Sequence, residues 1–283
     1  RSTQAKTLFP YTTLFRSVTQ HHAPKQLKLK SLHIKQVLDL LRRPRWLTGS
    51  VFMALAILSQ LTALALAPLI VVQPIGAIAL IITSVLNSRI HKIKLDPKTF
   101  VAIAITMLGV AGFVLFTATS ATQVKLDDGM LLQVVGVLIA VLAVFGILFA
   151  ASKGRVGPLQ YIFGAGVLYG FVASLAKVVI QRIIQGDLNW LTLLATLALA
   201  AAAILGGWFV QNAYAAGPPD LVIAGLTVID PAVAVGIAIV ILGEASSAAT
   251  GQVVGFGVSG LVAVLGVLML SKVHPQLSNK QEV

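Results

Sequence analysis

Long apolar stretches dominate the chain, and short segments rich in charge, proline and glycine separate them. Eight stretches reach the roughly 20 residues that an α-helix needs to cross a hydrocarbon core of about 30 Å. They cover residues 47–67, 70–90, 99–118, 130–151, 160–181, 190–214, 221–242 and 249–271. The pattern therefore predicts an all-α fold, a polytopic transmembrane helix bundle with eight visible spans.

Basic residues are distributed unequally between alternate connections of these spans. Fifteen fall on one side: Lys25, Lys28, Lys30, Lys35, Arg42, Arg43, Arg45, Arg89, Lys92, Lys94, Lys98, Lys153, Arg155, Lys272 and Lys280. Only Lys125 and Arg182 fall on the other. Because basic loops stay in the cytoplasm, residues 18–46 are expected to form a cytoplasmic loop of a multi-pass protein in a bacterial inner (plasma) membrane. The tail, residues 272–283, is then cytoplasmic too.

Composition supports a membrane protein over a water-soluble one. The chain is 57% hydrophobic and 11% charged, whereas soluble domains carry about a quarter charged residues. Its net charge of +12 could suggest a nucleic-acid partner, but the basic residues lie in loops between spans, so membrane lipid is the expected partner. The absence of cysteine excludes disulfides, thiolate metal sites and cysteine nucleophiles.

The beginning of the chain is unusual. Residues 1–17 resemble translated sequencing-adapter read-through and contain neither a signal peptide nor a span. We expect them to replace native sequence that included one helix; a genuine disordered leader is the alternative. Residues 31–43 place apolar side chains on one helical face, which fits an interfacial helix or an ordinary basic loop helix.

The spans contain an internal repeat. Gln73-Pro74 aligns with Asp230-Pro231, and Asn87 with Glu244, at a constant offset of 157 residues. Residues 47–118 form a first repeat, 130–151 a connecting span, and 160–271 a second repeat. Span 160–181 alone lacks a partner, so nine spans are expected in the intact protein. A single connecting span inverts the second repeat, an architecture typical of secondary transporters.

Two segments resemble the drug/metabolite transporter (DMT, EamA-like) superfamily: Ala65 to Ala77 with its Gln-Pro pair, and Val228 to Ala234 with Asp-Pro. The resemblance covers residues 31–272 and implies a transporter fold. Three features are similar to the nine-spanning NIPA-type magnesium transporter branch: the short path from Ala63 to Pro74, Trp46-x-x-Gly49 and Gln211-Asn212-x-Tyr214. That branch has acidic residues where this chain has Gln60 and Asn87, which weakens the case for a magnesium site.

Asp230 is the strongest candidate for a solute or ion site. An ionised carboxylate near the middle of a span costs about 2.5–3.5 kcal/mol on insertion scales and so needs a compensating reason. Pro231 has no backbone N–H and predicts a break in the helix beside it. Proton or cation binding at Asp230 would couple to cargo movement. The other interpretation is a protonated aspartic acid that bonds neighbouring helices together.

Other polar residues in or near spans allow two roles each. Lys177 could pair with Asp230 or extend to the outer interface near Arg182. The amides of Gln60, Gln73, Gln211 and Asn212 could coordinate a solute or join helices. Glu244 is expected at the outer interface, where it could cap a helix, gate or attract cations. Asp230 and Glu244 are the acidic ligands available to Mg²⁺.

Glycine motifs in the spans predict close helix packing. Gly255-Phe-Gly-Val-Ser-Gly260 spells GxGxxG but lies inside a span, so a dinucleotide site is excluded. Gly166-x-x-x-Gly170 and Gly251-x-x-x-Gly255 are packing faces of the same kind, which could also serve a homodimer. Since no catalytic triad, carboxylate pair or Walker motif occurs, neither an enzyme nor a cofactor is expected. The hypotheses are a secondary transporter, a magnesium permease and a non-transporting membrane scaffold.

Overall fold

The structure is a computed structural model that describes residues 44–76, 78, 82, 97–122, 124–152, 156–217 and 219–273. It divides into two units, Arg1–Thr62 and Ala63–Val283. The described part of the first unit is helical and belongs to α3 (Pro44–Leu66), which ends in the second unit. The predicted adapter segment and interfacial helix lie outside the described residues.

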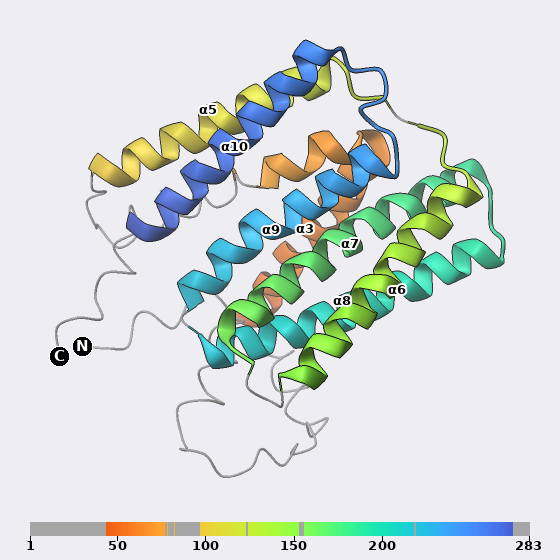
Figure 1. The fold of residues 1–283 in the computed structure, drawn as a ribbon, viewed down its shortest axis with the longest axis horizontal. Helices are drawn as coiled ribbons and strands as arrows, with labels where there is room; N and C mark the ends of the chain where they lie inside the picture. The colour runs from red at the N-terminus through yellow and green to blue at the C-terminus, as the bar shows by residue number, and fades with distance from the viewer. Residues whose placement is uncertain are drawn as a thin grey trace, which may run out of the picture. The chain divides into compact units, whose positions relative to one another are not determined.

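The described residues form α-helices and contain no β-strand. After α3 and a helical segment at residues 69–76, the helices are α5 (Pro97–Ala118), α6 (Asp128–Ala151), α7 (Pro158–Gln185), α8 (Trp190–Ala216), α9 (Pro219–Val240) and α10 (Thr250–Val273). Figure 1 shows α5 to α10 as long helical rods. The all-α prediction is confirmed.

Seven of the described helices are long and apolar enough to cross a membrane, which supports the predicted multi-pass bundle. Their bounds lie within a few residues of the predicted spans, and α7, with 28 residues, is the longest. Lys272 belongs to α10 and not to the tail. The predicted span 70–90 lies mostly outside the described residues.

Helix α7 is the central helix of the second unit. It packs between α8 and α9, while α5 pairs with α10 (Figure 1). Phe171, Leu175 and Val178 of α7 are almost completely buried. By contrast, α6, α8 and α10 expose large apolar side chains, which is what lipid-facing helices require.

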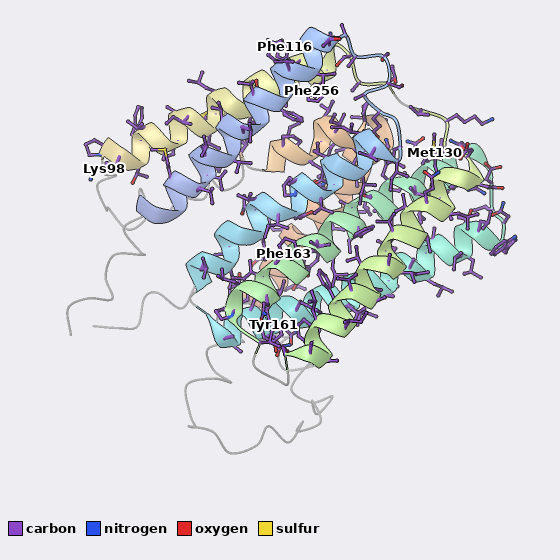
Figure 2. The ribbon with its side chains drawn as sticks, viewed as in Figure 1. Lys98, Phe116, Met130, Tyr161, Phe163 and Phe256 are labelled. Atoms are coloured by element: carbon purple, nitrogen blue, oxygen red, sulfur yellow. The ribbon has the colours of Figure 1, made fainter. Side chains whose placement is uncertain are left out.

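Small residues bring α5 and α10 together. A side chain at Gly255 would collide with the ring of Phe116, and one at Gly260 would press on Phe113. Phe116 and Phe256 lie near the same end of this helix pair in Figure 2. The GxGxxG stretch is therefore a packing face at these two glycines, whereas Gly251 and Gly257 have open space around them.

An aromatic cluster joins α6, α7 and α8. Tyr161, labelled in Figure 2 near the start of α7, lies 6.1 Å from both Trp208 and Phe209 between ring centroids. Phe149 of α6 lies 5.2 Å from Phe209. This cluster explains why Trp208 lies deeper in its helix than a residue of an interfacial aromatic belt would.

Candidate functional site

One face of α7 carries small and polar residues along most of its length. Gly166, Gly170, Ser174, Lys177 and Gln181 follow one another at spacings of three or four residues, so they share a face. We refer to these five residues as the α7 stripe. Every one of them is buried, and the Ser174 hydroxyl donates to the carbonyl of Gly170 in its own helix.

The first part of the α7 stripe lies against α9 beside Asp230. A Cβ atom added at Gly166 would lie 2.6 Å from the Cβ of Ile229. One added at Gly170 would lie 2.6 Å from the Cβ of Val233 and 3.0 Å from the Asp230 carbonyl oxygen. The predicted packing face at Gly166 and Gly170 is thus confirmed, and its partner is a helix of the same chain.

Asp230 has a carboxylate at this contact, and one of the carboxylate oxygens lacks a hydrogen-bond partner. Its Oδ1 atom is buried and has no hydrogen-bond partner, a condition shared among described side chains by Gln73 Nε2 and Gln185 Oε1. An unpaired buried polar group costs about 1–3 kcal/mol, and more for a charged group. This arrangement leaves Oδ1 free to accept a proton, a cation or a donor group from a solute.

Helix α9 runs without interruption through Pro231, so the predicted break at Asp230-Pro231 is wrong. Membrane helices tolerate proline when neighbouring groups can compensate for the lost hydrogen bond. Close packing on Gly166 and Gly170 also holds both sides of the proline in line. Pro231 therefore removes a backbone donor near Asp230 but does not end the helix.

The helix interruption lies instead at Ala67-Pro68. Here α3 ends at Leu66, and the helical segment 69–76 begins after the two non-helical residues Ala67 and Pro68. The last carbonyls of one helix and the first N–H groups of the next have no partner within their own helices. Leu64, Leu69 and Ile70 are buried, so these groups need partners from the protein.

The second part of the α7 stripe supplies partners for the carbonyls. Lys177 Nζ donates to the carbonyl oxygens of Leu64 and Ala67, at 2.7 Å each. The Gln181 side chain donates to the carbonyl of Ala65 at 3.1 Å. A cation beside a helix C-terminus also complements the helix dipole. Lys177 thus neither bonds to Asp230 nor extends to an interface, and its exposed fraction is 3%.

Glu244 supplies the partners for the N–H groups. Its Oε1 accepts from the N–H of Leu69 at 2.9 Å, and its Oε2 from that of Ile70 at 2.8 Å. Gly243, at φ 64°, adopts the left-handed conformation that ends the helical path after α9, and the Glu244 N–H bonds to the carbonyl of Ala238. This turn directs the Glu244 side chain to the start of segment 69–76.

Glu244 is buried within the protein, with an exposed fraction of 3%, and its place at the outer interface stays a prediction. Of the roles left open by the sequence, helix capping is the one observed. Burial raises the pKa of Glu244, while the N–H groups of Ile70 and Leu69 and the charge of Lys177 act in the opposite direction and do not fully offset it.

The predicted amide ligands of the second unit differ in burial and bonding. Gln73 is buried on segment 69–76, one turn after Leu69 and Ile70, with Nε2 unpaired. Gln211 is exposed on α8, and Asn212 donates to the carbonyl of Trp208 in the same helix. Gln60 lies on α3, in the first unit. Of these amides in the second unit, Gln73 is the one with a buried, unused donor.

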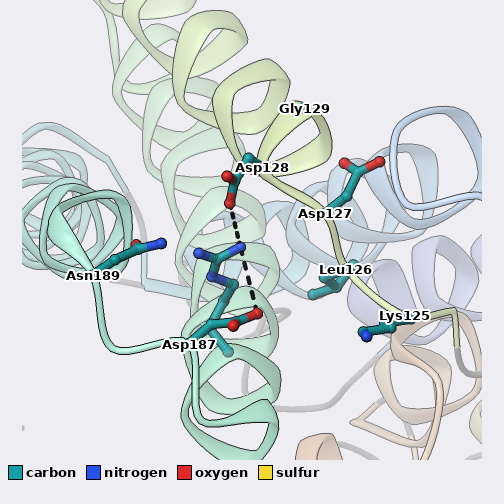
Figure 3. Close-up of a pocket in the computed structure, with 8 residues that line it drawn as sticks. Lys125, Leu126, Asp127, Asp128, Gly129, Asp187 and Asn189 are labelled. Carbon is teal, nitrogen blue, oxygen red and sulfur yellow. Dashed lines mark hydrogen bonds and ion pairs between the residues drawn. The ribbon is translucent and has the colours of Figure 1, made fainter.

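A second charged cluster, which the sequence did not single out, lies at the end of α7, and Figure 3 labels its residues Asp128 and Asp187. Arg182 of α7 is at its centre. Its guanidinium is buried and donates to Asp128 Oδ1 at 2.6 Å and to the Thr192 hydroxyl at 3.3 Å. A pocket of about 530 Å³ lies here, lined by Lys125, Leu126, Asp127, Asp128, Gly129, Arg182, Asp187 and Asn189. Charges at the ends of three consecutive predicted spans were the available signal.

Metal ligands do not gather in the described residues, where no group of three His, Cys, Asp or Glu side chains could hold an ion. Both oxygens of Glu244 already accept backbone hydrogen bonds. Mg²⁺ favours several oxygen ligands, and the described residues place Asp230 in α9 without a second carboxylate beside it.

Comparison with known proteins gives one relative without an assigned activity. The chain is 27% identical over 274 residues to an uncharacterized protein of Corynebacterium glutamicum, covering 92% of this chain and 91% of the relative. No protein-family model and no solved structure matches the chain. The similarity extends over nearly the full length of both proteins, so the helices described above fall mostly within it.

Proposed function

We propose that this protein is a secondary transporter that moves a small solute or ion across the membrane, with Asp230 as the group that binds cargo or a coupling proton. The observation that carries the proposal is the unpaired Oδ1 of Asp230, buried in an apolar helix where the α7 stripe approaches it closely. A static membrane scaffold would gain nothing from such a group, which is costly in a span.

The sequence repeat supports a transport role for the same position. Gln73 occupies the place in the first repeat that Asp230 occupies in the second. Both have a buried, unpaired polar atom, a donor in Gln73 and an acceptor in Asp230. Inverted repeats of transporters place their substrate groups in this way, near the membrane midplane. We place the chain with the DMT (EamA-like) proteins, in a plasma membrane with a cytoplasmic C-terminus.

The test is transport by the full chain in proteoliposomes, using a panel of metabolites and cations that includes Mg²⁺, under an imposed pH gradient. We expect Asp230→Asn to lower uptake of the transported solute at least about tenfold, equivalent to 1.4 kcal/mol, and to remove its pH dependence. Asp187→Asn makes the same chemical change at a carboxylate that is 47% exposed, and uptake should remain within about twofold of the unmodified chain.

Two results would contradict the proposal. Unchanged uptake and pH dependence in Asp230→Asn would remove Asp230 from the mechanism. If no solute in the panel is transported or raises the melting temperature of the purified protein, the scaffold hypothesis is favoured. Uptake of Mg²⁺ alone would identify the magnesium permease.

A further inference from the structure

The turn between α3 and segment 69–76 is stabilised from outside itself. Five hydrogen bonds join backbone atoms at this turn to side chains: Lys177 donates two, Gln181 donates one, and the two carboxylate oxygens of Glu244 accept one each. Lys177 and Gln181 come from α7, and Glu244 comes from the connection between α9 and α10. The residues that bond to the turn lie more than a hundred positions away from it in sequence.

The charges match the polarity of the two helix ends. The ammonium group lies at the negative end of α3, and the carboxylate at the positive end of segment 69–76. Each charge also lowers the cost of burying the other. If one of them is lost, the other keeps its bonds to backbone atoms but remains buried without its opposite charge.

The turn can move without disrupting either helix. It consists of Ala67 and Pro68, and Pro68 has no N–H to lose. Moving segment 69–76 away would break the side-chain bonds to the turn and separate Leu69, Ile70 and Val72 from the core cluster. Hydration of Lys177 and Glu244 would offset part of that loss. Such a movement would carry Gln73, which lies one helical turn further along.

Burial of a charged pair is a poor way to obtain stability alone, since apolar residues of similar volume are often as good or better. The pKa of Glu244 is raised because burial outweighs its hydrogen bonds and the charge of Lys177. Burial in the closed arrangement therefore disfavours the charged form of Glu244, and opening would hydrate that carboxylate. These features fit a device that opens during the working cycle.

We propose that Lys177 and Glu244 form a latch that holds the Ala67-Pro68 turn closed. This latch must release for solute to exchange at that end of the transport path. The proposal rests on the proposed transport function. The latch holds a turn of the same chain, so its opening can be measured without knowing the cargo.

The test uses thiol labelling, for which the chain is well suited because it has no cysteine. Val72→Cys places a reporter in segment 69–76, where Val72 is 6% exposed. Leu131→Cys places a second reporter in the core contact of α6, where Leu131 is fully buried. The full chain in lipid nanodiscs is exposed to a charged maleimide, and rates are divided by that of the exposed reporter Leu188→Cys.

In the chain with an intact latch, we expect the reporter at position 72 to label at least about tenfold faster than that at 131, because local opening needs less energy than global unfolding. Equal rates would overturn the proposal, and this comparison needs no latch variant to fold. Glu244→Ala and Lys177→Met should each raise the rate at position 72 a further tenfold or so, with little change at 131.

Asp128→Ala is the matched control, since it also removes the carboxylate partner of a buried cation, Arg182, at the same helix. It should leave the labelling rate at position 72 within about twofold of the rate in the chain with an intact latch. Equal acceleration by Asp128→Ala, or acceleration of both reporters in Glu244→Ala, would mean general loosening and would overturn the latch. Because no cargo is used, failure here leaves the uptake result for Asp230→Asn intact.

Discussion

The two parts of the α7 stripe treat buried polar groups in opposite ways. Around Lys177 and Glu244, each charged group bonds to backbone atoms of the turn and has an opposite charge nearby. Around Gly170, α9 comes close and Asp230 keeps an unpaired oxygen. Satisfied groups define one arrangement of the chain, whereas an unsatisfied one retains bonding capacity for something that arrives later. The contrast separates the residues that we propose as a latch from the residue that we propose as a cargo site.

The largest expected effect comes from breaking the satisfied part. Lys177→Met should lower the free energy of unfolding by about 3–5 kcal/mol, because Glu244 and the carbonyls of Leu64 and Ala67 lose their cation. Equilibrium unfolding in mixed micelles measures this loss. The double variant Lys177→Met/Glu244→Ala should lose less than the sum of the single variants. Strict additivity would show that the two charges are not coupled.

A smaller effect is expected from crowding the other part. Gly170→Ala should destabilise the protein by about 1–3 kcal/mol, because its Cβ would meet Val233 and the Asp230 carbonyl oxygen. Gly136→Ala in α6 is the matched control, since nothing lies within 4 Å of a Cβ there. It should be neutral or stabilising by up to about 1 kcal/mol. The same unfolding assay compares both, and equal losses would contradict the close contact.

The smallest expected effect is a pH dependence of the free energy of unfolding that comes from Glu244. The pKa of Glu244 is higher in the folded protein than its ordinary value of 4.5, so the folded state binds more protons in that interval. The free energy of unfolding should therefore fall as the pH rises from about 4.5 through the raised pKa. Glu244→Gln should flatten this part of the profile. A slope of opposite sign in the unmodified chain would contradict the dominance of burial.

Apolar spans could be predicted closely from sequence because length and hydropathy act locally. The starts and ends of α3, α5 and α6 all lie within three residues of the predicted spans. The packing of Gly166 and Gly170 was likewise readable, since small residues at that spacing favour close helix contact. What α7 packs against required the structure, because the partner helix lies some sixty residues further along the chain.

Polar residues were harder to assign, for physical reasons visible at Pro231 and Glu244. A proline predicts a lost hydrogen bond but not whether neighbouring packing keeps the helix straight, as it does in α9. The sequence predicts Glu244 as an interfacial charge because the N–H groups that donate to its carboxylate, those of Leu69 and Ile70, lie about 175 residues away. The same holds for Lys177, whose partners are backbone atoms that every residue carries.

The length of α7 makes this protein dependent on the lipid around it. Its 28 residues span about 42 Å at 1.5 Å per residue, which exceeds a hydrocarbon core of about 30 Å unless the helix tilts. Arg182 lies at its last turn and pairs with Asp128 at the start of α6, which is 59% exposed. We expect this ion pair to reach the headgroups in a bilayer of shorter acyl chains and to meet hydrocarbon in a thicker one. Hydrophobic mismatch thereby acts on the same helix that holds the turn and faces Asp230.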